Sequence, residues 1–103
     1  MNEKLLKIIN HYEVNNQQRK LQEEIFELQE AITTHELKKS VEYEIPLTEI
    51  IGTKEDITEE IADVMVLLEQ FKLYYEITSE EITKIFWSKV DRQLERIENE
   101  NSN

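Results

Sequence analysis

Two stretches of the chain repeat the same order of apolar and acidic residues. "LQEEIFEL" occupies residues 21–28, and "ITEEIADV" occupies residues 57–64. At 3.6 residues per turn, the apolar positions of each stretch form one stripe on a helix. The stripes extend to Leu21, Ile25, Leu28 and Ile32 in the first stretch, and to Ile57, Ile61, Val64 and Leu68 in the second. The repeat predicts two amphipathic helices that pack antiparallel, with both stripes facing the core.

The rest of the chain also favours helices. Its 103 residues include only one Gly and one Pro, and a chain of this length suits a single domain, residues 1–103. A helix is expected over residues 4–14 up to "VNNQQ", and the first stripe then begins near Gln18. We expect an all-α, antiparallel bundle of three to four helices.

Capping patterns and breaks suggest the boundaries of these helices. Asp56 with Glu59, and Thr78 with Glu81, have the spacing of capping boxes at helix N-termini. Residues 36–56 lose the helical period and are predicted to be a loop. Residues 99–103 are predicted to be a disordered tail.

Charge and composition argue against several classes of protein. The net charge of −11 opposes binding to nucleic acid, which depends on clustered Lys and Arg. The longest apolar run, "VMVLL" at 64–68, is too short to cross a bilayer. There is no Cys, so neither a disulfide framework nor a thiolate metal site is available. We expect a cytoplasmic protein that binds neither nucleic acid nor membrane.

Four carboxylates occupy matching positions beside the two apolar stripes. Glu24 and Glu27 on the first helix have the same offsets as Glu60 and Asp63 on the second. Antiparallel packing would bring all four to one rim, where mutual repulsion is costly unless a cation is bound. Oxygen ligands at this density suit Mg²⁺, with Mn²⁺ as a substitute. The alternative, four solvated acids paired with Lys or Arg, stays open.

Basic residues could complement such a site. Lys89, Arg92 and Arg96 recur along one edge of the last predicted helix, and Lys20 lies one turn before Glu24. Lys and Arg are the side chains that hold phosphate oxygens. Simple pairing with surface Glu residues is the alternative for each of them.

Taken together, "KLQEEIFELQEAI", "EEIADVMVLLEQ" and "KVDRQLERI" resemble the MazG-like branch of the all-α nucleoside triphosphate pyrophosphohydrolases, which are related to dimeric dUTPases. The resemblance covers most of residues 17–98. The family signature, E-E-x-x-E followed by E-x-x-D, falls on Glu23, Glu24, Glu27, Glu60 and Asp63. The sequence departs from the family in its longer segment between the motifs, and in having Trp87 where many members carry Asn.

The resemblance implies Mg²⁺-dependent cleavage of nucleoside triphosphates to a monophosphate and pyrophosphate, in house-cleaning or nucleotide-pool control. It implies a homodimer or homotetramer. The metal ligands implied are Glu24, Glu27, Glu60 and Asp63. Glu23 or Glu27 would act as the catalytic base, and the substrate phosphates would contact Lys20, Lys89 and Arg92.

A non-enzymatic reading of the sequence remains. An acidic helical adaptor, or an inhibitor that mimics DNA, would also carry a charge of −11. Such a protein would spread its acids without regard to the apolar stripes and would be indifferent to Mg²⁺. A relative that binds nucleotides without hydrolysing them is a third possibility.

Overall fold

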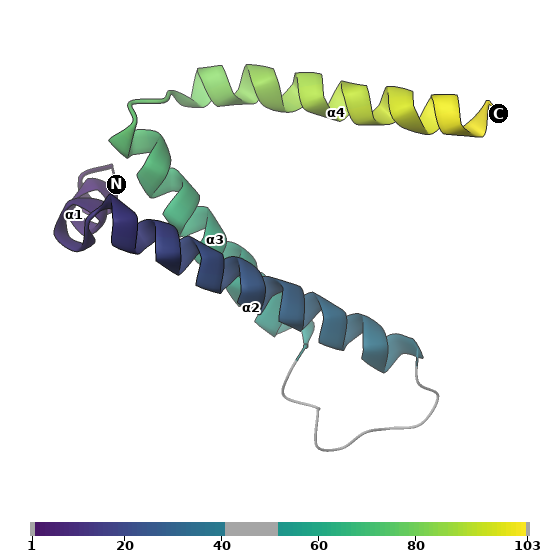
Figure 1. The fold of residues 1–103 in the computed structure, drawn as a ribbon, viewed down its shortest axis with the longest axis horizontal. Coiled ribbons are helices and arrows are strands. Elements are labelled where there is room, and N and C mark those ends of the chain that lie inside the picture. Colours follow the sequence, from purple (N-terminus) through teal and green to yellow (C-terminus); the bar gives the residue numbers. More distant parts are fainter. Residues whose placement is uncertain (1, 41–51, 103) are drawn as a thin grey trace.

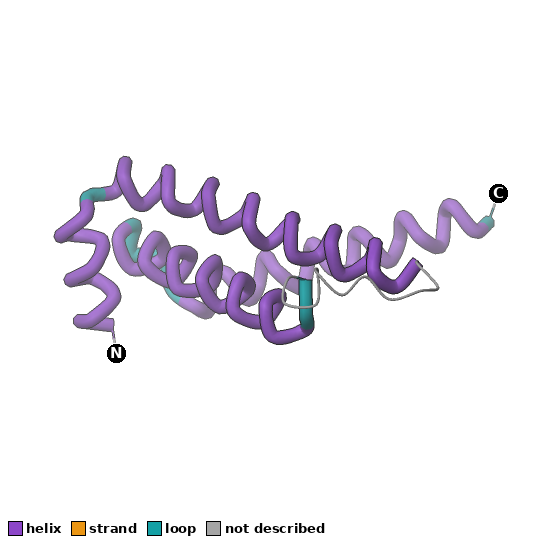
Figure 2. The backbone as a smooth tube through the Cα atoms, turned by 90° about the horizontal axis from the view of Figure 1, so that it is seen from below, coloured by secondary structure: helices purple, strands orange, loops and turns teal. Residues whose placement is uncertain are grey.

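The computed structural model describes residues 2–40 and 52–102, and over these ranges the chain is helical with no strand. The four helices are α1 (Asn2–Tyr12), α2 (Val14–Ser40), α3 (Lys54–Tyr74) and α4 (Ser79–Asn101) (Figure 1, Figure 2). The all-α prediction is confirmed. Within the described ranges, none of the helices combines the length and the apolar character that crossing a bilayer requires.

Helices α1 and α2 meet at a sharp corner at Glu13. This residue has a φ of 72°, a left-handed conformation that ends α1 before "VNNQQ" begins. Its amide still donates to Ile9 O at 2.8 Å, and Asn16 Nδ2 donates to Tyr12 O at 2.8 Å across the corner. Helix α2 therefore begins at Val14, four residues earlier than the period predicted, and α1 packs against α3 and α2.

The core between the helices is small and partly polar. Helices α2 and α3 run antiparallel, and with α1 they bury Ile9, Ala31 and Leu67 (Figure 1). The other buried side chains are polar: Gln17, Glu24 and Gln70. Helix α2 therefore faces α3 through residues 17, 24 and 31, which are seven apart and lie almost directly above one another.

This orientation corrects the prediction that both apolar stripes face the core. Ile25, Ile32, Ile61 and Leu68 are 40–47% exposed. The stripe is rotated from the buried residues by roughly 70° on α2 and roughly 120° on α3, and antiparallel packing puts both rotations on the same side. These four residues therefore form one exposed apolar face, on the side of the α2–α3 pair away from its acids, while the other stripe members, Leu21, Leu28, Ile57 and Val64, are half-buried. Within the chain, α2 instead contacts α3 through residues 17, 24 and 31, which are spaced seven apart.

The connection between α2 and α3 is anchored by close contacts where α3 begins. Gly52 has a φ of 78°, and a Cβ there would lie 2.8 Å from Thr34 Cβ, so only glycine fits against α2. His35 Nδ1 donates to Gly52 O at 2.9 Å. The predicted loop 36–56 is shorter in the structure, since residues 36–40 belong to α2 and 54–56 to α3. The remainder of that prediction, apart from Gly52 and Thr53, lies outside the described residues.

Two capping boxes fix the starts of α3 and α4. At α3 the cap is Thr53, which exchanges hydrogen bonds with Asp56, so the predicted Asp56–Glu59 box is wrong by one turn. Asp56 takes the third helical position because Thr53 already satisfies its amide. At α4 the predicted box of Thr78 with Glu81 is confirmed, with Glu81 N donating to Thr78 Oγ1 at 3.1 Å.

Helix α4 projects away from the other three helices (Figure 1). Helix α3 ends at Tyr74 and is followed by a left-handed Glu76 with a φ of 55°, and Lys72 Nζ donates to Ser79 Oγ at the turn. Beyond this turn, α4 packs against none of the other described helices. Its side chains are exposed except for the half-buried Val90. The helix continues to Asn101, so residues 99–101 are helical where a disordered tail was predicted.

Candidate metal centre

Three of the predicted carboxylates meet between α2 and α3. Glu24 comes from α2, and Glu60 and Asp63 come from one side of α3, three residues apart. One oxygen from each lies within 4.8 Å of the other two. Two oxygens on opposite sides of Mg²⁺ are about 4.2 Å apart, so small side-chain rotations would bring this group to coordination distance.

Asp63 is exposed and Glu60 is half-buried, but the burial of Glu24 and of one Glu60 oxygen distinguishes the group from an ordinary acidic surface. Glu24 is only 5% exposed, although it carries a charge. Oε2 of Glu24 and Oε2 of Glu60 are both buried, and neither has a hydrogen-bond partner in the described part of the chain. A buried carboxylate oxygen without a partner is costly. Hard oxygen donors left free in this way fit the ligand requirements of Mg²⁺ or Mn²⁺.

The electrostatics of the group follow from crowding. Burial, followed by interactions with Glu24, Glu27 and Asp63, raises the pKa of Glu60 to about 7. Burial and the charge of Glu24 also raise the pKa of Asp63. Two of the three acids thus hold their protons more tightly than usual, as expected where like charges converge without a cation.

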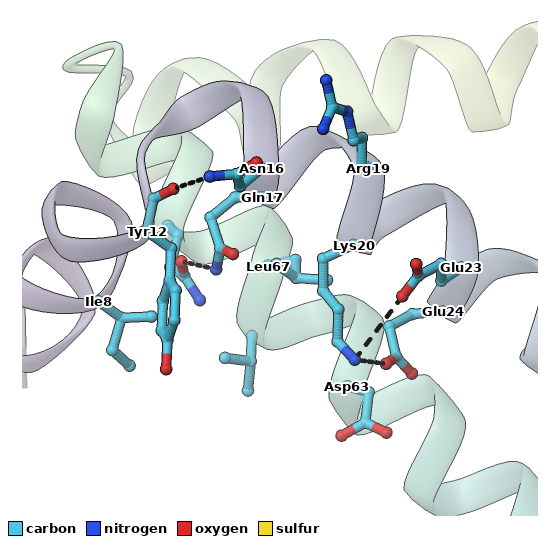
Figure 3. A pocket seen from close by; sticks show the side chains of 12 residues that line it. Ile8, Tyr12, Asn16, Gln17, Arg19, Lys20, Glu23, Glu24, Asp63 and Leu67 are labelled. Carbon is cyan, nitrogen blue, oxygen red and sulfur yellow. Dashed lines mark hydrogen bonds and ion pairs between the residues drawn. The ribbon is translucent and has the colours of Figure 1, made fainter.

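Lys20 supplies the positive charge nearest to the group. Its Nζ lies 3.0 Å from Glu24 Oε1 and 3.9 Å from Glu23 Oε2 (Figure 3). Burial alone would raise the pKa of Glu24, but hydrogen bonding and attraction from Lys20, with smaller contributions from Glu60 and Glu27, lower it. The hydrogen bond with Glu24 correspondingly raises the pKa of Lys20. One ammonium group partly offsets the three carboxylates and satisfies only one of the two Glu24 oxygens.

The remaining acidic candidates lie beside the group. Glu23 lines the same cavity as Glu24 and Asp63 and is largely exposed. Glu27 lies outside the group of three close oxygens and lines an adjoining cavity of about 370 Å³ with Glu60. It is near enough for its charge to raise the pKa of Glu60. The predicted roles of Glu27 as fourth ligand and of Glu23 or Glu27 as base stay predictions.

The two basic candidates on α4 are not brought to this centre within one chain. Lys89 and Arg92 are exposed on a helix that packs against none of α1 to α3. A contact with the bound phosphates would therefore have to come from the α4 of another copy. Of the predicted phosphate contacts, the chain itself places Lys20 alone beside the carboxylates.

Two functional candidates were missed by the sequence analysis. Gln17 and Gln70 are 7% and 2% exposed, and Gln17 Nε2 donates to Gln70 Oε1 at 2.9 Å. Their spacing from the predicted metal ligands could have identified them, because Gln17 precedes Glu24 by seven residues and Gln70 follows Asp63 by seven. A polar residue in register with a predicted ligand belongs to the same face of the helix.

Comparison of the chain with known protein families, with characterised proteins and with solved structures found no match.

Proposed function

We propose that this protein is a Mg²⁺-dependent nucleoside triphosphate pyrophosphohydrolase, which converts a ribo- or deoxyribonucleoside triphosphate to its monophosphate and pyrophosphate. The observation that carries the proposal is the close group of Glu24, Glu60 and Asp63, in which one buried oxygen of Glu24 and one of Glu60 have no hydrogen-bond partner among the described residues. The resemblance of the sequence motifs to the MazG-like branch supports the choice of reaction. Control of the nucleotide pool would place the protein in the cytoplasm.

Each site residue has a defined task in this proposal. Glu24, Glu60 and Asp63 hold the cation, and Glu27 is the fourth ligand. When bound, Mg²⁺ polarises the phosphate oxygens and lowers the pKa of the attacking water. Glu23 or Glu27 accepts the proton of that water as it attacks the α-phosphorus, and pyrophosphate leaves.

Lys20 changes partners when substrate binds. Its side chain is 52% exposed, so it could turn from Glu24 toward the phosphates. The ammonium then faces the phosphate chain at the mouth of the cavity. There it offsets the negative charge that develops on the departing pyrophosphate.

The active form is proposed to be a homodimer or homotetramer. Two apolar surfaces have no partner among the described helices: the face formed by Ile25, Ile32, Ile61 and Leu68, and the apolar stripe of α4. The α4 stripe includes Phe86, Leu94 and Ile97, which are 50–54% exposed. Exposed apolar surface of this extent favours association. Packing of α4 on another copy would also bring Lys89 and Arg92 toward a carboxylate centre.

The direct test is product analysis with a panel of ribo- and deoxyribonucleoside triphosphates, in Mg²⁺, in Mn²⁺ and in EDTA. We expect metal-dependent release of pyrophosphate together with the nucleoside monophosphate. Glu60→Gln should lower kcat/KM by at least about a hundredfold, because a cation ligand supplies several kcal/mol of transition-state stabilisation. Glu59→Gln makes the same chemical change at an exposed position of α3 and should retain activity.

Two results would contradict the proposed enzymatic activity. If folded protein hydrolyses none of the triphosphates, or if Glu60→Gln is as active as Glu59→Gln, the enzymatic assignment is wrong. Absence of turnover with unchanged stability in Mg²⁺ would favour the acidic binding protein, in which the carboxylates form a docking surface.

A further inference from the structure

The carboxylate centre opens into a cavity of about 640 Å³ between α1, α2 and α3. Sites for small-molecule ligands are typically about 300 to 1,000 Å³. One end of the cavity carries Glu24, Asp63 and Lys20, and the other carries Tyr12, Gln17 and Gln70 (Figure 3). We propose that the second end binds the nucleobase of the nucleotide whose phosphates lie at the first. This inference rests on the proposed function for the identity of the ligand.

The two ends are separated by the same distance on both helices. Gln17 and Glu24 are seven residues apart on α2, as are Asp63 and Gln70 on α3, which corresponds to about 10 Å along each axis. Because the helices are antiparallel, the amides face each other at one level and the acids at the other. A sugar and its first phosphate bridge a separation of this size between the edge of a base and the phosphoanhydride.

The amide pair is built into the wall of the cavity. Gln17 and Gln70 are both more than nine-tenths buried, yet both line the cavity. Burial of two amides costs free energy that apolar side chains of similar size would not require. Their mutual hydrogen bond of 2.9 Å uses one donor and one acceptor. It leaves the carbonyl oxygen of Gln17 and the NH₂ group of Gln70 for a ligand.

A free acceptor beside a free donor suits the hydrogen-bonding edge of a nucleobase. Each base carries a donor and an acceptor side by side on its Watson–Crick edge, and protein amides bind such edges. If the O and N atoms of both side-chain amides are exchanged, Gln70 donates to Gln17, and the pair still presents one free acceptor and one free donor. The pair therefore favours a planar heterocycle over a second phosphate, which offers acceptors alone.

The walls beside the amides are aromatic and aliphatic. Tyr12 and Ile8 lie on the side of Gln17 in the cavity (Figure 3). Val66 also lines the cavity. Tyr12 is 54% exposed, which leaves its ring accessible to a ligand. Asn16 Nδ2 donates to Tyr12 O across the Glu13 corner, which ties Tyr12 to the start of α2. Bases stack favourably on aromatic rings.

The test replaces both amides at once with a side chain of similar volume. Gln17→Met/Gln70→Met removes the free donor and acceptor without leaving either partner unpaired. Gln18→Met makes the same change at the adjacent, exposed position and is the control. Two quantities are measured for the four bases: kcat/KM with the triphosphates, and the Kd of the nucleoside monophosphates in Mg²⁺.

The wild-type protein should prefer one base, and Gln18→Met should keep that preference. In the double variant the ratio between the best and the poorest base should fall by about tenfold or more, the factor that corresponds to 1.4 kcal/mol. Tyr12→Ala should weaken binding of all four bases by about 5- to 100-fold. Unchanged base ratios in a double variant that unfolds at the wild-type temperature would overturn the inference.

The binding measurement separates this inference from the proposed function. If no triphosphate is hydrolysed but the monophosphates bind, and the double variant loses base preference, the enzymatic assignment fails and the base site stands. If triphosphates are hydrolysed with no effect of the double variant, the base site fails and the enzymatic assignment stands. If the wild-type protein binds none of the monophosphates, the base site is wrong.

Discussion

The α2–α3 pair buries polar side chains, whereas helix α4 exposes apolar ones. Between α2 and α3 the buried side chains include a carboxylate and two amides, Glu24, Gln17 and Gln70. On α4 large apolar side chains, including Phe86 and Leu94, are more than half exposed. A chain that folded only for its own stability would reverse this arrangement, since apolar burial stabilises and polar burial costs. The difference is the one that the proposed polar ligand in the interior and the proposed association through α4 would require.

The largest effect is expected on α4. Leu94→Glu places a charge in the stripe that is proposed to pack on another copy, and burial of an unpaired charge costs several kcal/mol. The dissociation constant of the oligomer should rise at least about a hundredfold. Ser88→Glu adds the same charge on the opposite side of α4 and should leave assembly unchanged. Sedimentation equilibrium measures both, and a wild-type protein that stays monomeric at high concentration would contradict the expectation.

The α2–α3 pair should respond to pH in the absence of metal. The pKa of Glu60 is raised to about 7 in the folded protein, so the folded state binds this proton more tightly than the unfolded state does. The resulting stabilisation is complete below the ordinary pKa of a Glu and is lost as the pH rises through about 7. Asp63, whose pKa is also raised, contributes with the same sign.

We therefore expect the free energy of unfolding in EDTA to decrease between about pH 5 and pH 8, as measured by urea denaturation. Glu60→Gln removes the ionisable group and should flatten this decrease, while Glu59→Gln should retain the wild-type profile. Mg²⁺ should restore stability at the alkaline end. Identical profiles for wild-type protein and Glu60→Gln would show that the carboxylates do not repel one another as the structure indicates.

The smallest expected effect is the change in the free energy of unfolding when the N-cap of α3 or of α4 is removed. In the Leu94→Glu background, where α4 should have no partner, Thr53→Ala should lower the free energy of unfolding of the α1–α3 unit by about 1 kcal/mol. Thr78→Ala removes the equivalent cap of α4, which packs against none of the other described helices, and should leave the urea transition of that unit unchanged. Equal destabilisation by both variants would mean that α4 contributes to the core.

The sequence predicted the elements of the fold better than their orientation. The helical period and the Thr78–Glu81 box located α4, and the repeated motifs brought Glu24, Glu60 and Asp63 together. The prediction of how α2 and α3 are rotated was wrong. An apolar stripe shows which surface of a helix avoids water, but it does not show whether another helix of the same chain covers that surface. Ile25 and Ile61 remain exposed for this reason, and α2 turns Glu24 toward α3 instead.

Other features depend on contacts that sequence patterns do not encode. The left-handed Glu13 ends α1 without a Gly or Pro, and Thr53 takes the cap of α3 although Asp56 has the same propensity. The burial of Gln17 against Gln70 pairs residues 53 positions apart. Heptad register with Glu24 and Asp63 was the one available signal for it.

Titration with Mn²⁺ followed by electron paramagnetic resonance measures directly whether Glu24, Glu60 and Asp63 bind a divalent cation. Wild-type protein and Glu59→Gln should bind Mn²⁺ saturably, and Mg²⁺ should compete. Glu60→Gln should weaken binding by at least about tenfold, because one of the close oxygen ligands loses its charge. Equal binding by Glu60→Gln and Glu59→Gln, or no saturable binding by folded wild-type protein, would contradict the proposed cation binding.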